Sequence, residues 1–149
     1  MCIRDRSTSL TPVKGQSLAD GVWYWRVAFV DANNKVGPYS PVQSFTKEYP
    51  TPTLSWPEQD QIIDAAPTFA WEPIDGAAYY KLDYANNSSY NGATSITTDQ
   101  ASTTPTKAMA HTNYFWRVQM FDADRNPGAL VEGKFLLGYL NYLPTVEGP

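Results

Sequence analysis

The side chains with the clearest chemical potential are three oxygen donors at alternate positions, Asp122, Asp124 and Asn126. Spaced carboxylate and amide oxygens of this kind can ligate calcium. An EF-hand loop beginning at Asp122 would need Gly at its sixth position and Glu at its twelfth, but the chain has Pro127 and Gly133 there. Asp and Asn also favour tight turns, because their side chains bond nearby backbone amides. We therefore expect turn chemistry, with a calcium site as the alternative.

Catalysis needs a constellation that the sequence does not supply. His111 is the only histidine and Cys2 the only cysteine, so neither a Ser-His-Asp nor a Cys-His site is indicated, and no intrachain disulfide can form. The 15 acidic residues are scattered over predicted loops, and no pair can be assigned to glycoside hydrolysis. We expect no enzymatic activity and no cofactor.

A second group of side chains could form a binding surface. Tyr79, Phe115, Arg117 and Phe121 take outward positions on two predicted strands. Aromatic rings beside an arginine can stack on a sugar or contact another protein. The same residues could instead pair across strands and stiffen the sheet, with the arginine covering a ring. The sequence leaves both interpretations open.

Short strands with strict alternation must position these side chains. Strands are predicted at 68–71, 78–84, 95–98, 103–107, 114–121 and 130–137, after a proline-rich edge segment at 50–57, with a hairpin loop at 122–128. Lys81 and Asp83 are expected to face outward beside Tyr79. The inward residues form the predicted core: Phe69, Trp71, Tyr80, Leu82, Tyr84, Tyr114, Trp116, Val118, Met120 and Phe135. About seven short strands with turn signals every ten residues or so predict an all-β, two-sheet sandwich.

The chain also contains the same stretch twice. Residues 22–32 (VWYWRVAFVDA) return as 113–123 (NYFWRVQMFDA). Trp25 and Trp116 are 91 residues apart, and Phe45 and Phe135 are 90 apart. A period of about 90 suits a small all-β module better than a helical repeat of about 20 to 50 residues.

This period divides the chain into modules. Residues 50–138 are predicted to be a complete module, and 7–49 the C-terminal half of a preceding one, its strands E, F and G. Residues 139–149 would be a linker and the start of a third module, and 1–6 (MCIRDR) look like a non-native leader. Because 7–49 lack the strands that would cover the tryptophans, we expect that half-module to be unstable alone.

Several motifs resemble those of bacterial fibronectin type III-like modules. Residues 67–77 followed by Tyr80-Lys81-Leu82 are similar to their B and C strands, and 20–27, 37–41 and Phe45 to their F strand, loop and G strand. The resemblance covers 7–149 and implies a seven-stranded sandwich. It also implies a non-catalytic spacer or adhesion module, extracellular or at a cell surface, in a tandem array or attached to a secreted enzyme. Residues 126–130 depart from the pattern at 37–40, so this loop is expected to be reshaped, and neither loop contains Arg-Gly-Asp.

Charge and hydropathy limit the partners. The formal net charge is −4, which disfavours nucleic acid. No stretch approaches the roughly 18 apolar residues of a membrane span. We expect neighbouring modules of the same chain as partners. The alternative is a carbohydrate- or protein-binding accessory module of a secreted hydrolase, with an extracellular glycan or surface protein as its partner.

Overall fold

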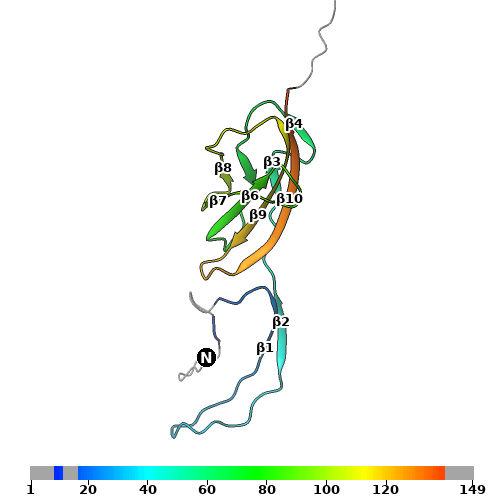
Figure 1. The fold of residues 1–149 in the computed structure, drawn as a ribbon. Helices are drawn as coiled ribbons and strands as arrows, with labels where there is room; N and C mark the ends of the chain where they lie inside the picture. Colours follow the sequence, from blue (N-terminus) through cyan, green and yellow to red (C-terminus); the bar gives the residue numbers. More distant parts are fainter. Residues whose placement is uncertain (1–8, 12–16, 140–149) are drawn as a thin grey trace, which may run out of the picture.

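The computed structural model describes residues 9–11 and 17–139, and in this part of the chain strands and loops form the whole structure (Figure 1). Three sheets are present, with strand orders β1-β2, β4-β10-β9-β6-β7 and β3-β5-β8. The all-β class predicted from the sequence is confirmed. The strands are β1 (Gly21–Trp25), β2 (Gln43–Lys47), β3 (Leu54–Trp56), β4 (Gln61–Ile63), β5 (Phe69–Trp71), β6 (Tyr79–Ala85), β7 (Thr94–Thr98), β8 (Ser102–Thr103), β9 (Thr112–Phe121) and β10 (Pro127–Leu137).

The two larger sheets face each other and enclose an aromatic core. Phe69 from the three-stranded sheet meets Trp116 from the five-stranded sheet with ring centroids 5.0 Å apart, and Trp71 meets Tyr80 at 5.3 Å. Burial alternates along β9 as expected for a strand with one face in the core. All ten residues of the predicted core are buried. No helix among the described residues has the length and hydropathy of a membrane span.

The first strand of the sandwich is divided between the sheets. β3 pairs with β5, whereas β4 pairs in parallel with β10. Pro57 lies between them and has no amide hydrogen to donate, so strand pairing is interrupted there. The described sandwich therefore has eight strands rather than the seven predicted.

Two strand boundaries also differ from the predictions. The strand predicted at 103–107 is limited to β8, at Ser102–Thr103, since Pro105 cannot donate to a ladder. The last strand was predicted at 130–137 but begins at Pro127, with a register shift between Pro127 and Leu130. This irregularity allows Pro127 to be the first residue of the strand.

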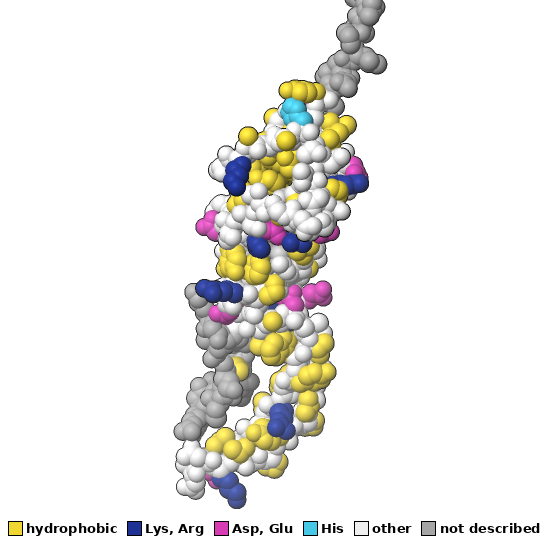
Figure 2. Space-filling view, in the orientation of Figure 1, with side chains coloured by type: hydrophobic (Ala, Val, Ile, Leu, Met, Phe, Trp, Pro, Cys, Tyr) yellow, Lys and Arg dark blue, Asp and Glu magenta, His cyan; other side chains and the backbone are white. Residues whose placement is uncertain are grey.

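The two-stranded sheet repeats the pairing of β9 with β10. Trp23 pairs with Phe45 and Trp25 with Gln43, as Tyr114 pairs with Phe135 and Trp116 with Gly133. In Figure 1 this hairpin projects away from the sandwich. Figure 2 shows hydrophobic side chains along its length.

The first turn of each repeated segment is closed in a related way. Tyr114 accepts a hydrogen bond at its hydroxyl from the Ala110 amide at 3.1 Å, as a tyrosine corner does near the start of strand F. Trp23 occupies the equivalent position and donates from Nε1 to the Ala19 carbonyl oxygen at 2.8 Å. The contact spans four residues in both places, although the donor and the acceptor are exchanged.

The segments predicted at the two ends of the chain lie mostly outside the part that the structure describes. The suggested leader at 1–6 and positions 140–149 of the predicted third module lie outside the described residues.

Candidate functional site

A polar row crosses the outward face of the five-stranded sheet. Its members lie directly opposite one another on neighbouring strands. They are Ser95 on β7, Asp83 on β6, Arg117 on β9 and Glu132 on β10. Arg117 donates to Asp83 Oδ2 from Nε at 3.0 Å and from a terminal guanidinium nitrogen at 3.0 Å. Ser95 donates to Asp83 Oδ1.

Asp83 is only 6% exposed although it takes an outward position. The sequence pattern gave its direction but not its burial, because the covering groups come from other strands. Burial opposes ionisation, but hydrogen bonds from Ser95 and Arg117 and the charges of Lys81 and Arg117 leave its pKa below the ordinary value. Both carboxylate oxygens of Asp83 therefore have donors.

Tyr90 covers this row and was not singled out by sequence reasoning. The Arg117 guanidinium carbon lies 4.2 Å from the centre of its ring. Asn87 holds the loop by accepting from the Asn91 amide at 3.0 Å. Burial and the Glu132 carboxylate raise the pKa of Tyr90 to about 12. A lone aromatic within the polar loop 86–92 was the available signal.

The four predicted binding residues do not converge on one site. Tyr79 and Phe121 are a cross-strand pair whose rings stack with centroids 4.9 Å apart and 3° between planes. Arg117 is engaged by Asp83 and Tyr90. Phe115 lies six positions from Phe121 on the same strand, roughly 20 Å away. The geometry favours cross-strand stiffening for Tyr79, Phe121 and Arg117.

Phe115 lines a shallow depression with a volume of about 400 Å³. Polar side chains surround it, including Asn86, Asn113 and Lys134. Lys134 Nζ lies 2.9 Å from Asp60 Oδ1, and this hydrogen bond lowers the pKa of the Asp60 carboxyl. A half-buried aromatic ring among amides and an ion pair is an arrangement that could contact a polar ligand.

The Asp122 turn is closed by its own side chains. Asp122 Oδ1 accepts from the backbone amides of Asp124 at 2.9 Å and Asn126 at 2.8 Å. Its Oδ2 accepts from Asn126 Nδ2 at 2.9 Å. Burial disfavours the charge, but these hydrogen bonds keep the pKa of Asp122 below its ordinary value. Within the described residues no group of three or more His, Cys, Asp and Glu could hold a metal.

The first copy has the same turn. Asp31 Oδ1 accepts from the amides of Asn33 and Lys35, both at 2.9 Å. Asn34 and Arg125, which are equivalent, have φ values of 63° and 68°. The turn itself is therefore unchanged, whereas the expected difference at 126–130 is present: these residues enter β10 with a register shift, and 37–42 lie outside β2. The difference lies after the turn, where equivalent positions change from 91 to 90 residues apart.

The side chain of His111 packs against an aromatic ring. Its ring meets the Tyr139 ring edge-on, with centroids 4.4 Å apart. Asp20, its counterpart in the first copy, accepts from the backbone amide of Tyr49.

Among known proteins, no family model and no curated protein matches the chain. Three solved structures are similar in fold. The first is an α-L-rhamnosidase of Streptomyces avermitilis complexed with L-rhamnose, at 18% identity and TM-score 0.45; the match covers 61% of this chain and 10% of that one. The FN1–FN3 domains of chicken CNTN1 share 15% identity at TM-score 0.47, covering 81% and 44%.

The third structure is an Fn3-like protein of Clostridium thermocellum, with 19% identity, TM-score 0.43 and coverage of 63% and 96%. The chain thus spans less than half of the first two proteins. Two of the three are fibronectin type III proteins by name, the class that the sequence motifs resemble. The sandwich itself is established by the strand pairing of this chain.

Proposed function

We propose that this chain is a non-catalytic spacer and adhesion element of a tandem β-sandwich array in a secreted or cell-surface protein. Its partners would be neighbouring modules of the same chain. One observation carries the proposal: the hairpin of β1 and β2 reproduces the register and the turn of β9 and β10. We infer that β1 and β2 are the last two strands of a preceding module, the one expected at 7–49.

The exposed face of the hairpin supports this inference. Trp23, Trp25 and Phe45 are 37%, 49% and 44% exposed. Their equivalents Tyr114, Trp116 and Phe135 are 8%, 0% and 1% exposed. Such a face would be covered by strands like β3, β5 and β8, which form the opposing sheet of the sandwich. Each module would then bury its own core, as a load-bearing spacer requires.

The test is to complete the hairpin. Residues 50–111 are joined directly to residues 21–139, because Asp20 and His111 are equivalent positions. We expect two folded modules in line, with a maximum dimension by small-angle scattering about twice that of 50–139 alone. The fluorescence of Trp23 and Trp25 should be shielded from iodide, a quencher dissolved in the solvent. A compact globe, or tryptophans still open to iodide, would contradict the proposal.

A second candidate function is favoured by the depression beside Phe115. It is a binding role on a polysaccharide, as an accessory module of a secreted hydrolase. Phe115→Ala should abolish retention on a polysaccharide panel, while Tyr79→Ala, on the stacked pair, should leave it unchanged. Equal retention of both variants and the parent chain on every polysaccharide would rule this function out.

A further inference from the structure

Tyr49, between β2 and β3, is held from both sides. On the hairpin side its backbone amide donates to both oxygens of Asp20, each at 3.1 Å. Asp20 also pairs with Lys47 at 3.1 Å, and the Lys47 ammonium lies 3.4 Å from the centre of the Tyr49 ring. These contacts fix the backbone of Tyr49 relative to the hairpin.

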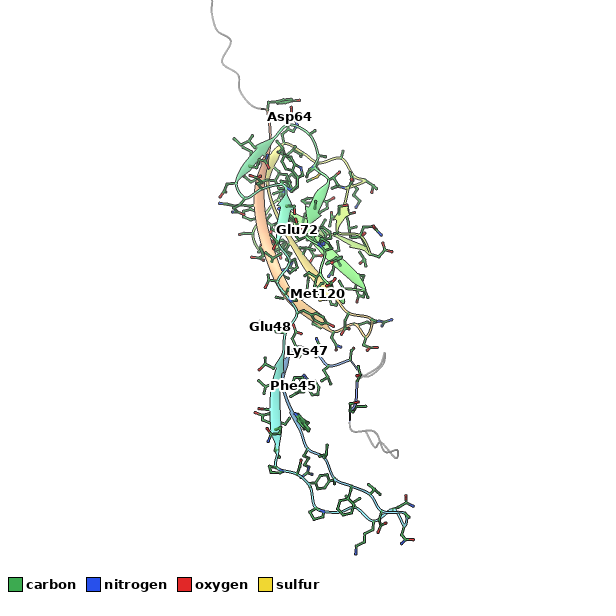
Figure 3. The ribbon with its side chains drawn as sticks, turned by 180° about the vertical axis from the view of Figure 1, so that it is seen from behind. Phe45, Lys47, Glu48, Asp64, Glu72 and Met120 are labelled. Carbon is green, nitrogen blue, oxygen red and sulfur yellow. The ribbon has the colours of Figure 1, made fainter. Side chains whose placement is uncertain are left out.

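On the sandwich side the hydroxyl and the ring of Tyr49 are engaged. The hydroxyl donates to Asp122 Oδ2 at 3.3 Å. The ring and its Cβ lie close to two glycines: a Cβ at Gly76 would be 3.2 Å from Tyr49 Cε1, and one at Gly128 would be 3.2 Å from Tyr49 Cβ. Figure 3 shows the surroundings, with Lys47 and Glu48 at the end of the hairpin and Met120 on the sandwich.

The two oxygens of Asp122 have different tasks. Oδ1 closes the turn, as Oδ1 of Asp31 does in the first copy. Oδ2 accepts within the turn from Asn126 Nδ2 at 2.9 Å. From outside the turn it accepts from Tyr49 and, at 3.1 Å, from the hydroxyl of Ser17, which also donates to Asp124 Oδ2. Among the described residues, Asp31 has no donor from outside its own turn, and that turn has the same conformation. The contacts that Tyr49 and Ser17 make with Asp122 Oδ2 are therefore additional to turn closure.

Asp122 is 3% exposed, so its charge needs donors that water cannot supply. We propose that the β9–β10 turn is a docking site for the linker tyrosine of the preceding module, and that the contact between Tyr49 and Asp122 fixes the angle between successive modules. The docked groups are the phenol of Tyr49 and the nearby hydroxyl of Ser17, which donate to the Asp122 carboxylate. Gly76 and Gly128 leave room for the tyrosine. This inference rests on the proposed function, because it takes 17–49 as the end of a preceding module.

The experiment uses the full 149-residue chain and two variants. Tyr49→Phe removes only the hydroxyl. Asp122→Asn keeps the oxygen that accepts from the two backbone amides of the turn. It replaces Oδ2, which accepts from Tyr49 and also from Asn126 Nδ2, with a donor. Asp31→Asn, at the equivalent turn position, and Tyr24→Phe, on the exposed hairpin, are the matched controls. Residual dipolar couplings compare the alignment of β1–β2 with that of β6–β10, and amide exchange is followed at Tyr49.

We expect one common alignment in the parent chain and both controls. In both variants the couplings of the hairpin should fall at least about twofold, and the Tyr49 amide should exchange about tenfold faster, as for a lost hydrogen bond to a charged group. If Tyr49→Phe leaves couplings and exchange unchanged, or if a formed hairpin aligns independently in the parent chain, the docking site is wrong but the module proposal stands. Absence of the contact between Trp23 and Phe45 would overturn both.

Discussion

The hairpin of β1 and β2 and the pair β9–β10 have the same pairing, the same turn and a related first corner, yet opposite surroundings. The inward ring of Trp116 is fully buried, while that of Trp25 is about half exposed. Arg117 lies against Tyr90, a residue of a distant loop, whereas Arg26 lies against Tyr39 with 3.9 Å between the guanidinium carbon and the ring centre. Local sequence therefore specifies a hairpin, and the opposing sheet makes it stable.

The largest expected difference between the two hairpins is in amide exchange. An isolated two-stranded ribbon is marginally stable, whereas strands in a closed core open only with the global unfolding of the module. Amides of β9 should exchange at least about a thousandfold more slowly than those of β1. Equal protection measured by NMR would show that the hairpin is stabilised by some other partner.

Replacing a tryptophan with alanine should also affect stability differently in the two regions. Trp116→Ala should lower the unfolding free energy of the sandwich by about 3–5 kcal/mol, because it leaves a cavity in the core. Trp25→Ala removes a side chain that is half exposed and should change it by less than about 1 kcal/mol. Urea titrations followed by circular dichroism provide the measurement. Similar losses for both variants would contradict the comparison.

The residues that pair with the two tryptophans also differ, because Gly133 is opposite Trp116 and Gln43 is opposite Trp25. A Cβ at Gly133 would lie 2.8 Å from Trp116 Nε1 and 2.8 Å from Leu54 Cδ1, so Gly133→Ala should cost about 1–3 kcal/mol through overpacking. Gly138→Ala is the control, since its Cβ would meet nothing nearer than 3.7 Å. The hairpin has Gln43 at the equivalent position, and Gln43→Ala should have no effect. The melting temperatures of the three variants test this prediction, and a similar decrease in all three would contradict it.

The corner contact predicts a smaller effect. Tyr114→Phe should cost about 0.5–1.5 kcal/mol, since the Ala110 amide loses its acceptor. Trp23→Phe removes the equivalent hydrogen bond on the exposed hairpin and should leave the melting of the sandwich unchanged. A destabilised sandwich in the Trp23 variant would mean that the two regions unfold together.

Acid should weaken the sandwich through two carboxyls. The folded pKa values of Asp83 and Asp122 lie below the ordinary value, which is about 3.9. Their contribution is complete above that value and is lost as the pH falls through the lower folded values. Asp122→Asn should therefore flatten the decline in melting temperature below about pH 4. An unchanged acid profile would contradict this assignment.

Much of this architecture could be predicted from the sequence. Alternation along 114–121 predicted the inward face of β9. Asp31 and Asp122, at equivalent positions of the repeat, predicted the two turns. The count of strands was missed because Pro57 divides the first one between two sheets. The burial of Asp83 and the role of Tyr90 were missed because they depend on residues that are neighbours only across strands.

The sequence alone determined the period of about 90, which is read directly from the repeated residues. It also determined the side-chain directions along β5, β6 and β9 and the chemistry of the turns, because these depend on backbone geometry within a few residues. Only the tertiary structure decided which faces are covered, that Arg117 is occupied by Asp83, and that Tyr49 reaches Asp122. Those contacts join residues 34 and 73 positions apart. Such distances are closed by the packing of two sheets, and no local pattern encodes them.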